Sequence, residues 1–286
     1  LDLRNNGGGA LIEANKIIGL FVASGPTVQV KHSKGYIQPY GDGKAIQVWK
    51  KPLVVLVNRY SASASEIVAG AIQDYQRGLI VGQRTFGKGT VQSLEQLSKG
   101  QIKITESKYY RVNGTSTQNK GVVPDIELPA TWDIETVGES SYPTSLKWDT
   151  VRPYRHKKFS VDSKKLENIK NLYLERLAEE PNLAYLEKVR QRYDLNKNKK
   201  VLSLNFDIRE TEKSIRKEWL LELENERRSL LDLETFETYA DLLEENKNDS
   251  PSDEDSINIE EDFLLIEVTN IVTDFLNLKF ILSKVD

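Results

Sequence analysis

The chain has 286 residues, of which 38% are apolar, 29% are charged and none is cysteine. Its 40 basic and 43 acidic side chains leave a net charge of −3, so no general electrostatic attraction to nucleic acid or to an anionic membrane is expected. The absence of cysteine excludes disulfides, a thiol nucleophile and thiolate metal sites, and the length allows about two domains of ~150 residues.

The first residues have the pattern of a strand, a turn and a helix. Leu1–Arg4 is predicted to be a short strand, residues 5–9 (NNGGG) a turn in which glycine permits positive φ, and Ala10–Phe21 an amphipathic helix. Because the chain has no methionine and begins inside a predicted strand, we expect further sequence upstream of residue 1. No apolar run is long and uninterrupted enough to span a bilayer.

Apolar and alternating runs predict the strands that follow. Leu53–Val57 and Leu79–Gly82 are uniformly apolar, as in strands that are buried on both faces, and a helix is predicted between them over Ser63–Arg77. The glycines between Lys34 and Gly43 predict a polar loop. Further strands or extended segments are expected at Thr27–His32, Ile46–Trp49, Val91–Leu97, Gln101–Val112 and Gly121–Pro129. Repeated β-α-β units thus predict an α/β domain over residues 1–130.

The composition changes after residue 130. Residues 131–160, with Pro143 and Pro153, predict a loop-like linker, and residues 161–286 predict a charged helical domain. Within it, the acidic, proline-bearing run at residues 249–261 is predicted to be a mobile linker. Helices are expected at Ser163–Glu179, Leu183–Tyr193, Ile208–Leu231, Leu233–Asn246 and Phe263–Leu282. Polar residues interrupt the last of them, which favours a docking helix over a membrane span.

Ser63 opens the helix that follows the first buried strand. With Glu66 it fits a capping box, in which the hydroxyl caps a free amide and the glutamate reaches back to the serine amide. A serine at a strand-to-helix turn also presents its oxygen where backbone amides can stabilise an oxyanion, and the Ala64 amide is the natural donor. The position therefore suits either a structural cap or a nucleophile.

Lys88 lies between two glycines after the second buried strand. The loop nearly matches a phosphate-binding loop, but Gly89 stands where that loop needs a hydroxyl, and a strand rather than a helix follows. As a strand, Gly89–Gln92 places Lys88, Thr90 and Gln92 on one face, where the glutamine amide could orient the lysine amine. A serine and a lysine at the ends of neighbouring buried strands could form a nucleophile and base pair. A flexible surface lysine is the alternative.

Three other features are better explained as surface residues than as parts of a site. Ser214 and Lys217 match an S-x-x-K pattern, but they lie in a charged helix without a glycine turn or an apolar strand nearby, so we interpret them as solvated surface. His32 and His156 stand in polar, loop-like surroundings without metal-ligand spacing, and we interpret both as ordinary surface residues. We expect neither a metal nor a cofactor.

Five motifs resemble those of one protein family. LDLRNNGGG, SASASE, TFGKGTVQ, YYRVNG and GVVPDIELP, in this order and spacing, are similar to the motifs of tail-specific, or C-terminal processing, proteases, which are serine peptidases with a Ser-Lys dyad. These motifs cover about residues 1–130. VLSLNFDIRE and the terminal helical region are similar to the C-terminal helical domain of the large periplasmic members. The resemblance implies part of a crotonase/ClpP-like α/β protease core followed by a mostly α-helical domain.

The resemblance also implies roles for individual residues. Ser63 would be the nucleophile, Lys88 the general base and Gln92 the residue that orients the base. The amides of Ala64 and Gly8 would form the oxyanion hole, and the neighbouring glycines of the same turn, Gly7 and Gly9, stay open as alternatives to Gly8. The implied activity is cleavage of protein substrates near an accessible C-terminus through an acyl-enzyme, in the periplasm, with an adaptor protein as an optional partner.

Two expectations limit this hypothesis. Family members carry a PDZ domain and an N-terminal region upstream of the LDLR strand, so we expect these residues alone to be inactive or impaired. A base that works near neutrality needs a pKa of about 7 to 8, so the mechanism requires a desolvated Lys88 without a carboxylate partner. The alternatives are a non-catalytic binding or scaffold module in which Ser63 only caps its helix, and a phosphate-binding enzyme.

Overall fold

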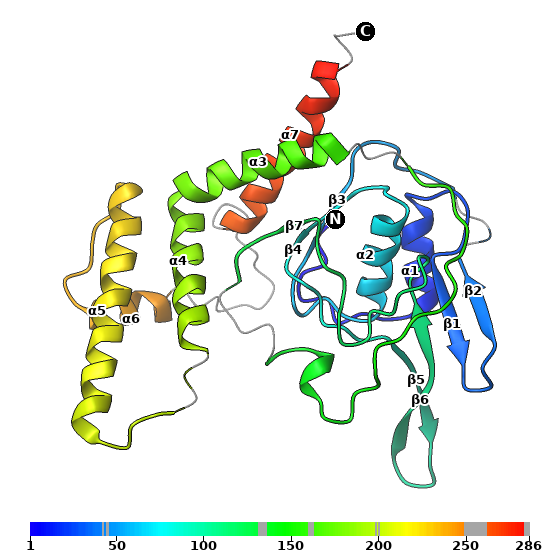
Figure 1. Cartoon of the computed structure of the whole chain (residues 1–286), viewed down its shortest axis with the longest axis horizontal. Coiled ribbons are helices and arrows are strands. Elements are labelled where there is room, and N and C mark those ends of the chain that lie inside the picture. Colours follow the sequence, from blue (N-terminus) through cyan, green and yellow to red (C-terminus); the bar gives the residue numbers. More distant parts are fainter. Residues whose placement is uncertain are drawn as a thin grey trace. The chain divides into compact units, whose positions relative to one another are not determined.

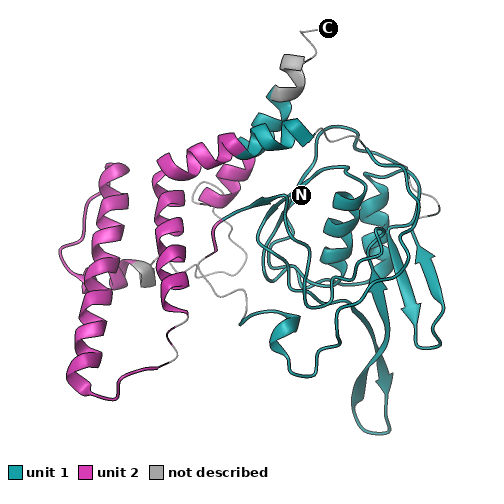
Figure 2. Ribbon diagram, viewed as in Figure 1, with its two compact units in different colours: residues 1–128, 133–170, 270–286 teal, residues 129–132, 171–269 magenta. Residues whose placement is uncertain are grey.

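The computed structural model describes residues 1–41, 43, 46–130, 136–159, 163–197, 199, 201–248 and 262–282. The chain divides into two compact units, shown in different colours in Figure 2. The first comprises residues 1–128, 133–170 and 270–286, and the second residues 129–132 and 171–269. The predicted acidic linker at residues 249–261 lies outside the described residues.

A three-stranded parallel sheet lies in the first unit. Its strands, in the order β3-β4-β7, are β3 (Val54–Val57), β4 (Leu79–Gly82) and β7 (Ile126–Glu127). Helix α2 (Ala64–Asp74) follows β3 and leads back to β4 (Figure 1). Every residue of β3 and β4 is buried, as the uniformly apolar runs predict. The predicted N-terminal strand is reduced to a parallel bridge from Asp2 to Leu56, beside β3.

A four-stranded antiparallel sheet, in the order β2-β1-β6-β5, forms the other sheet of this unit. It consists of β1 (Val28–His32), β2 (Ile37–Tyr40), β5 (Thr90–Gln96) and β6 (Gln101–Tyr110). β5 and β6 form a hairpin, with an irregularity in register between Val91 and Gln92. Since β5 is the edge strand and begins two residues after Lys88, the hairpin carries the lysine loop at its base.

Two predictions in this part of the chain are wrong. Ile46–Trp49 is not a strand: the amides of Val48 and Trp49 donate to the Leu20 carbonyl at 2.9 and 3.0 Å, which ties the segment to the end of α1 (Leu11–Gly19) rather than to a sheet. Ile37–Tyr40, predicted to belong to a polar loop, is strand β2. Its proline is tolerated because β2 is at the edge of the sheet.

Helices α1 and α2 lie side by side in Figure 1 and contribute to a common core. Every residue of α2 except Gln73 is buried, including the polar residues Ser65, Glu66 and Asp74. Buried polar groups are destabilising unless they are hydrogen bonded, so both ends of α2 need partners. The apolar core around it includes Ile18, Val28, Val55, Val57, Val68, Ile72, Tyr75, Ile80, Tyr109, Val112 and Val122.

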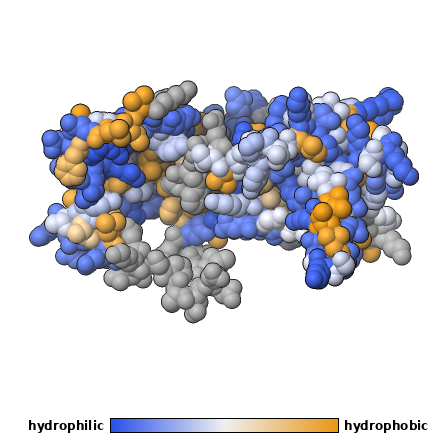
Figure 3. Space-filling model, turned by 90° about the horizontal axis from the view of Figure 1, so that it is seen from below, coloured by the Kyte–Doolittle hydropathy of each residue, from blue (hydrophilic) through white to orange (hydrophobic). Residues whose placement is uncertain are grey.

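The remaining part of the chain is mostly helical, and the predicted class, an α/β core followed by a mostly helical C-terminal region, is confirmed. An ion pair within the second unit joins Arg176 to the buried carboxylate of Glu267 at 2.7 Å. None of the described helices is long and apolar enough to cross a membrane. The face seen in Figure 3 is largely hydrophilic, with separate apolar patches. The helices are α3 (Ser163–Glu179), α4 (Pro181–Asn196), α5 (Phe206–Leu230), α6 (Tyr239–Asn248) and α7 (Phe263–Leu282).

The glycine that ends β4 gives a test of the parallel sheet. Gly82 has φ of 123°, and a Cβ there would lie 1.9 Å from the Val57 carbonyl oxygen of β3. Gly82→Ala therefore has to separate the two strands, and we expect the free energy of unfolding to fall by about 3 to 5 kcal/mol in urea titrations.

Gly100, in the hairpin turn, is the matched control. It also has a positive φ, 81°, but a Cβ there meets no atom within 4 Å. Gly100→Ala should lower the free energy of unfolding only by the cost of placing alanine at a positive φ, about 1 to 2 kcal/mol. Equal losses for the two variants would contradict the close approach of β3 and β4.

Candidate active site

Ser63 occupies a strained turn between β3 and α2. Its φ of 56° and ψ of −113° are sparsely populated by residues other than glycine, and such strain persists only where the surroundings hold it. Gly8 packs directly against the turn: a Cβ on Gly8, which has φ of 102°, would lie 2.8 Å from the Ser63 Cβ and 2.9 Å from the Ala64 nitrogen. Only glycine fits there, so the glycine-rich segment and the serine turn form one surface.

The candidate oxyanion donors lie at this surface. Ala64 is the first residue of α2, so its N–H has no acceptor within the helix. The Gly8 N–H donates to the Asn6 side-chain oxygen at 3.0 Å, and this bond has to open before Gly8 can serve a substrate. A Cβ on Gly7 or Gly9 would meet no atom within 4 Å, so Gly8 is the glycine of the three that contacts the serine turn.

One buried carboxylate joins the serine turn to the lysine loop. Glu66 Oε2 accepts the Ser63 N–H at 2.8 Å and the Lys88 N–H at 2.9 Å, so the two nitrogens cannot be farther apart than the sum of these distances. Glu66 Oε1 accepts the Thr85 hydroxyl at 2.6 Å and the Gly87 N–H at 2.7 Å. Burial raises the pKa of Glu66 to about 7, although these four donors favour the carboxylate.

The same contacts argue against a phosphate-binding loop. In such a loop the backbone amides of the glycine-rich segment point at the phosphate. Here the amides of Gly87 and Lys88 donate to Glu66, and the Gly89 N–H donates to the Gln118 side chain at 2.9 Å. Three successive amides are therefore occupied by protein acceptors.

Lys88 lies at the wall of a cavity of about 660 Å³. The side chain is half-buried and forms no ion pair among the described residues. Burial and the charge of Lys103 lower the pKa of Lys88, whereas Glu139 and Glu66 raise it. The net direction favours the neutral amine that a general base requires. The cavity is lined by Phe86, Lys88, Thr90, Gln92, Thr105, Glu139, Tyr142, Thr144, Ser145 and Leu146.

Gln92 shares this cavity but forms no hydrogen bond with the lysine amine. Lys88, Thr90 and Gln92 all line it, in keeping with the alternation expected for a strand. The Gln92 amide donates to the Thr105 hydroxyl across the hairpin at 3.4 Å. Its orienting role remains a prediction. Ser63 is half-buried and is not among the residues that line the cavity, so the structure brings the two loops together through Glu66 rather than through the cavity wall.

Residues 136–149, here called the strap, form the second wall of the cavity. The Glu139 N–H donates to the Phe86 carbonyl at 3.0 Å, and Gln118 donates to the Glu139 carboxylate at 3.2 Å. Farther along, Trp148 Nε1 donates to the Ser116 carbonyl at 2.9 Å. Sequence reasoning placed this segment in a linker and missed its contribution to the site, because it carries neither a periodic pattern nor a recognisable motif.

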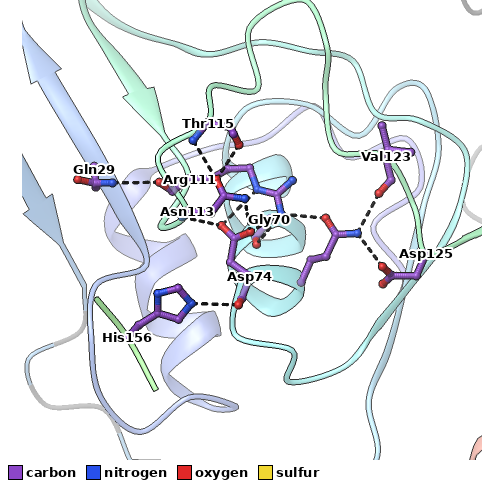
Figure 4. A network of polar contacts seen from close by, with 10 residues as sticks. Gln29, Gly70, Asp74, Arg111, Asn113, Thr115, Val123, Asp125 and His156 are labelled. Carbon is purple, nitrogen blue, oxygen red and sulfur yellow. Dashed lines mark hydrogen bonds and ion pairs between the residues drawn. The ribbon is translucent and has the colours of Figure 1, made fainter. Parts of the chain in front are cut away.

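The C-terminal end of α2 is held by a second polar network (Figure 4). The Asp74 carboxylate pairs with Arg111 at 2.5 Å and accepts the Asn113 side-chain amide at 2.8 Å. His156 is half-buried, with Nε2 3.0 Å from the Asp74 carbonyl and its ring 4.8 Å from the Tyr75 ring. It is therefore a contact of the helix end and not the ordinary surface residue that was predicted.

Comparison with known proteins gives two family matches. The model of peptidase family S41 matches residues 1–128, and the model described as the C-terminal domain of tail specific protease matches residues 132–277. The two matches together cover both the α/β part and the helical part of the chain.

Individual relatives agree with this assignment. The tail-specific protease of Haemophilus influenzae is 38% identical over 96% of this chain, which corresponds to 40% of that protein. The chloroplastic C-terminal processing peptidase of Tetradesmus obliquus is 44% identical over 45% of this chain and 28% of its own length. The carboxy-terminal-processing protease of Bartonella bacilliformis is 43% identical over 44% of this chain and 30% of its own length. The chain thus spans less than half the length of these relatives.

The Glu66 bridge can be tested by Glu66→Gln. An amide has one acceptor oxygen, so its NH₂ group would face either the Ser63 and Lys88 donors or the Thr85 and Gly87 donors. In both orientations the lysine loop loses one of its two contacts with residue 66 and should be less firmly held. We expect labelling of Ser63 by a serine-directed fluorophosphonate to slow at least about tenfold.

The stability of Glu66→Gln should depend on pH in a different way from that of the wild-type protein. The folded state keeps the Glu66 proton up to about pH 7, whereas the unfolded chain releases it near the ordinary value of 4.5. The folded state then binds more protons in this window, so the wild-type protein should lose stability relative to Glu66→Gln as pH rises through it, by up to about 1.4 kcal/mol per pH unit. A difference that stays constant across the window in urea titrations would contradict the raised pKa.

Two charge-removing substitutions should shift the pKa of Lys88 in opposite directions. Glu139→Gln removes a charge that raises the pKa of Lys88, so the pH at which fluorophosphonate labelling of Ser63 rises should shift downward. Lys103→Gln removes a charge that lowers this pKa, so the same transition should shift upward. Lys99→Gln, at the exposed hairpin turn, is the control and should leave it in place. Shifts of the same sign would show that Lys88 does not govern the transition.

Proposed function

The chain belongs to the tail-specific proteases of peptidase family S41, and from this premise we propose that it carries the catalytic region of a serine endopeptidase that uses Ser63 and Lys88. The single observation that supports this most directly is the Glu66 carboxylate oxygen that accepts both the Ser63 and the Lys88 amides. This contact joins the turn that carries Ser63 to the loop that carries Lys88, which supports a role for the two as nucleophile and base.

The proposed reaction begins with a neutral Lys88. Its amine takes the proton of the Ser63 hydroxyl, and the serine oxygen attacks a peptide carbonyl. The amides of Ala64 and Gly8 stabilise the tetrahedral oxyanion, and Lys88 then gives its proton to the departing amine. Water, activated by the same amine, hydrolyses the acyl-enzyme and restores Ser63. Gln92, which follows Thr90 on the same strand face, would orient the lysine amine.

The proposed substrates are proteins or peptides with accessible C-termini. The support is the family and the names of the relatives, which describe tail-specific or C-terminal processing. A periplasmic location and an optional adaptor protein belong to the same proposal and follow from the resemblance to the large periplasmic members. Since the chain spans 40% of its Haemophilus relative, these properties are proposed for the whole protein.

A binding or scaffold module is the second candidate function. The observation in its favour is that Ser63 does not line the cavity at Lys88, while the Glu66 half of the capping box is formed at 2.8 Å. The two candidates differ in reactivity: a dyad makes Ser63 react with a fluorophosphonate, whereas a serine that only caps a helix has no activated hydroxyl.

Substitution of the dyad in the full-length protein tests the proposal. Ser63→Ala and Lys88→Ala should each lower peptide hydrolysis at least about 10³-fold, because the two residues act as a unit, while substrate binding persists. Gln92→Ala should reduce the rate less.

Ser214→Ala and Lys217→Ala are the matched controls, since they change the same residue types in α5, within the second unit. Both should retain wild-type hydrolysis. Near-wild-type rates for Lys88→Ala would rule out the dyad, and an unchanged rate for Gln92→Ala would remove only its orienting role.

A further inference from the structure

A buried tyrosine contacts the backbone of both candidate catalytic residues. Tyr109 lies on β6, is 1% exposed and belongs to the apolar core. Its hydroxyl is 3.1 Å from the Ser63 carbonyl oxygen and also bonds to the Lys88 carbonyl oxygen. Tyr109 opens the motif YYRVNG, but the motif gave it no role, because the contacts join positions 46 and 21 residues apart along the chain.

Tyr109 and Glu66, here together called the bracket, contact the backbone of Ser63 and Lys88 from two sides. The carboxylate accepts the N–H groups of Ser63 and Lys88, and the phenol reaches their carbonyl groups. Both backbone groups of each residue are therefore held by the same two side chains. A shift of the lysine loop relative to the serine turn has to break a contact on each side.

We propose that Tyr109 is a positioning residue that keeps Lys88 in register with Ser63 through its hydroxyl, an inference that rests on the proposed Ser-Lys function. The hydroxyl carries one proton, which it shares between the two carbonyls. Burial raises the pKa of Tyr109 well above its ordinary value, so the phenol keeps this proton.

The hydroxyl is not needed to satisfy either carbonyl. Ser63 O also accepts the Ile67 N–H at 3.0 Å, and Lys88 O also accepts the Thr117 hydroxyl at 3.2 Å. Removing the Tyr109 hydroxyl therefore leaves no buried carbonyl without a donor, and the cost to stability is small. What the hydroxyl adds is a second connection between the two loops, beside the one made by Glu66. A purely structural tyrosine would affect stability and activity together, whereas a positioning residue affects activity alone.

The test is Tyr109→Phe in the full-length protein, with Tyr110→Phe as the matched control. Tyr110 is the next residue of β6 and is equally buried. Its hydroxyl lies 3.1 Å from each carboxylate oxygen of Asp149, the last residue of the strap, and neither residue lines the cavity at Lys88, so the control removes the same group from a site without contact to the bracket. We expect Tyr109→Phe to lower kcat for a peptide substrate by about 10- to 100-fold, with KM and the melting temperature nearly unchanged. Tyr110→Phe should keep the wild-type kcat.

The pH dependence supplies a readout that packing alone would not move. If the lysine loop is loosened, the Lys88 ammonium gains water, its pKa rises, and the acid limb of kcat should shift to higher pH in Tyr109→Phe but not in Tyr110→Phe.

Three outcomes would overturn the inference. They are equal kcat values for the two variants, an unshifted acid limb, and a loss of activity that runs parallel to a loss of melting temperature. A wild-type protein that neither hydrolyses peptides nor reacts with a fluorophosphonate would refute the proposed function itself, which is a distinguishable result.

Discussion

The site depends on one carboxylate that is held away from water. Ionising Glu66 in the core is costly, and the protein offsets that cost with four hydrogen-bond donors from the serine turn, the Thr85 hydroxyl and the lysine loop. Because each donor belongs to a different residue, the carboxylate cannot be satisfied unless both loops are in place. The requirement to pair a buried charge thus becomes a geometric constraint on the two candidate catalytic residues.

Helix α2 transmits this constraint through the first unit. The helix is almost wholly buried, and its two ends are held by separate polar networks, at Glu66 and at Asp74. The strained backbone of Ser63 persists because neither end of the helix can move to relieve it. Close packing of Gly8 against the same turn leaves no room for a side chain, so the strand, the turn and the helix are mutually dependent.

Local patterns in the sequence predicted much of this arrangement, and the non-local contacts lay beyond them. The apolar runs of β3 and β4 and the helix between them could be recognised because burial on both faces leaves an uninterrupted apolar signal. Glu66 was predicted only as half of a capping box, since that pattern relates residues three apart and is silent about Lys88. β2 was missed because the glycines on either side of it, from Gly35 to Gly43, indicated a loop, and its Pro39 is tolerated because β2 is an edge strand. Tyr109 was predicted as part of a strand and of the motif YYRVNG without a role of its own, and only the folded sheet brings its hydroxyl to the two loops.

The strap shows that the candidate site extends beyond the region matched by the peptidase family model. The S41 match ends at residue 128, yet the cavity beside Lys88 is also lined by Glu139, Tyr142 and Leu146, which lie beyond that limit. A fragment trimmed to the family boundary would lack one wall of this cavity and one of the charges that shift the pKa of Lys88. A fragment used to study this site therefore has to extend beyond Trp148, whose indole binds the Ser116 carbonyl, and include His156, which contacts the end of α2.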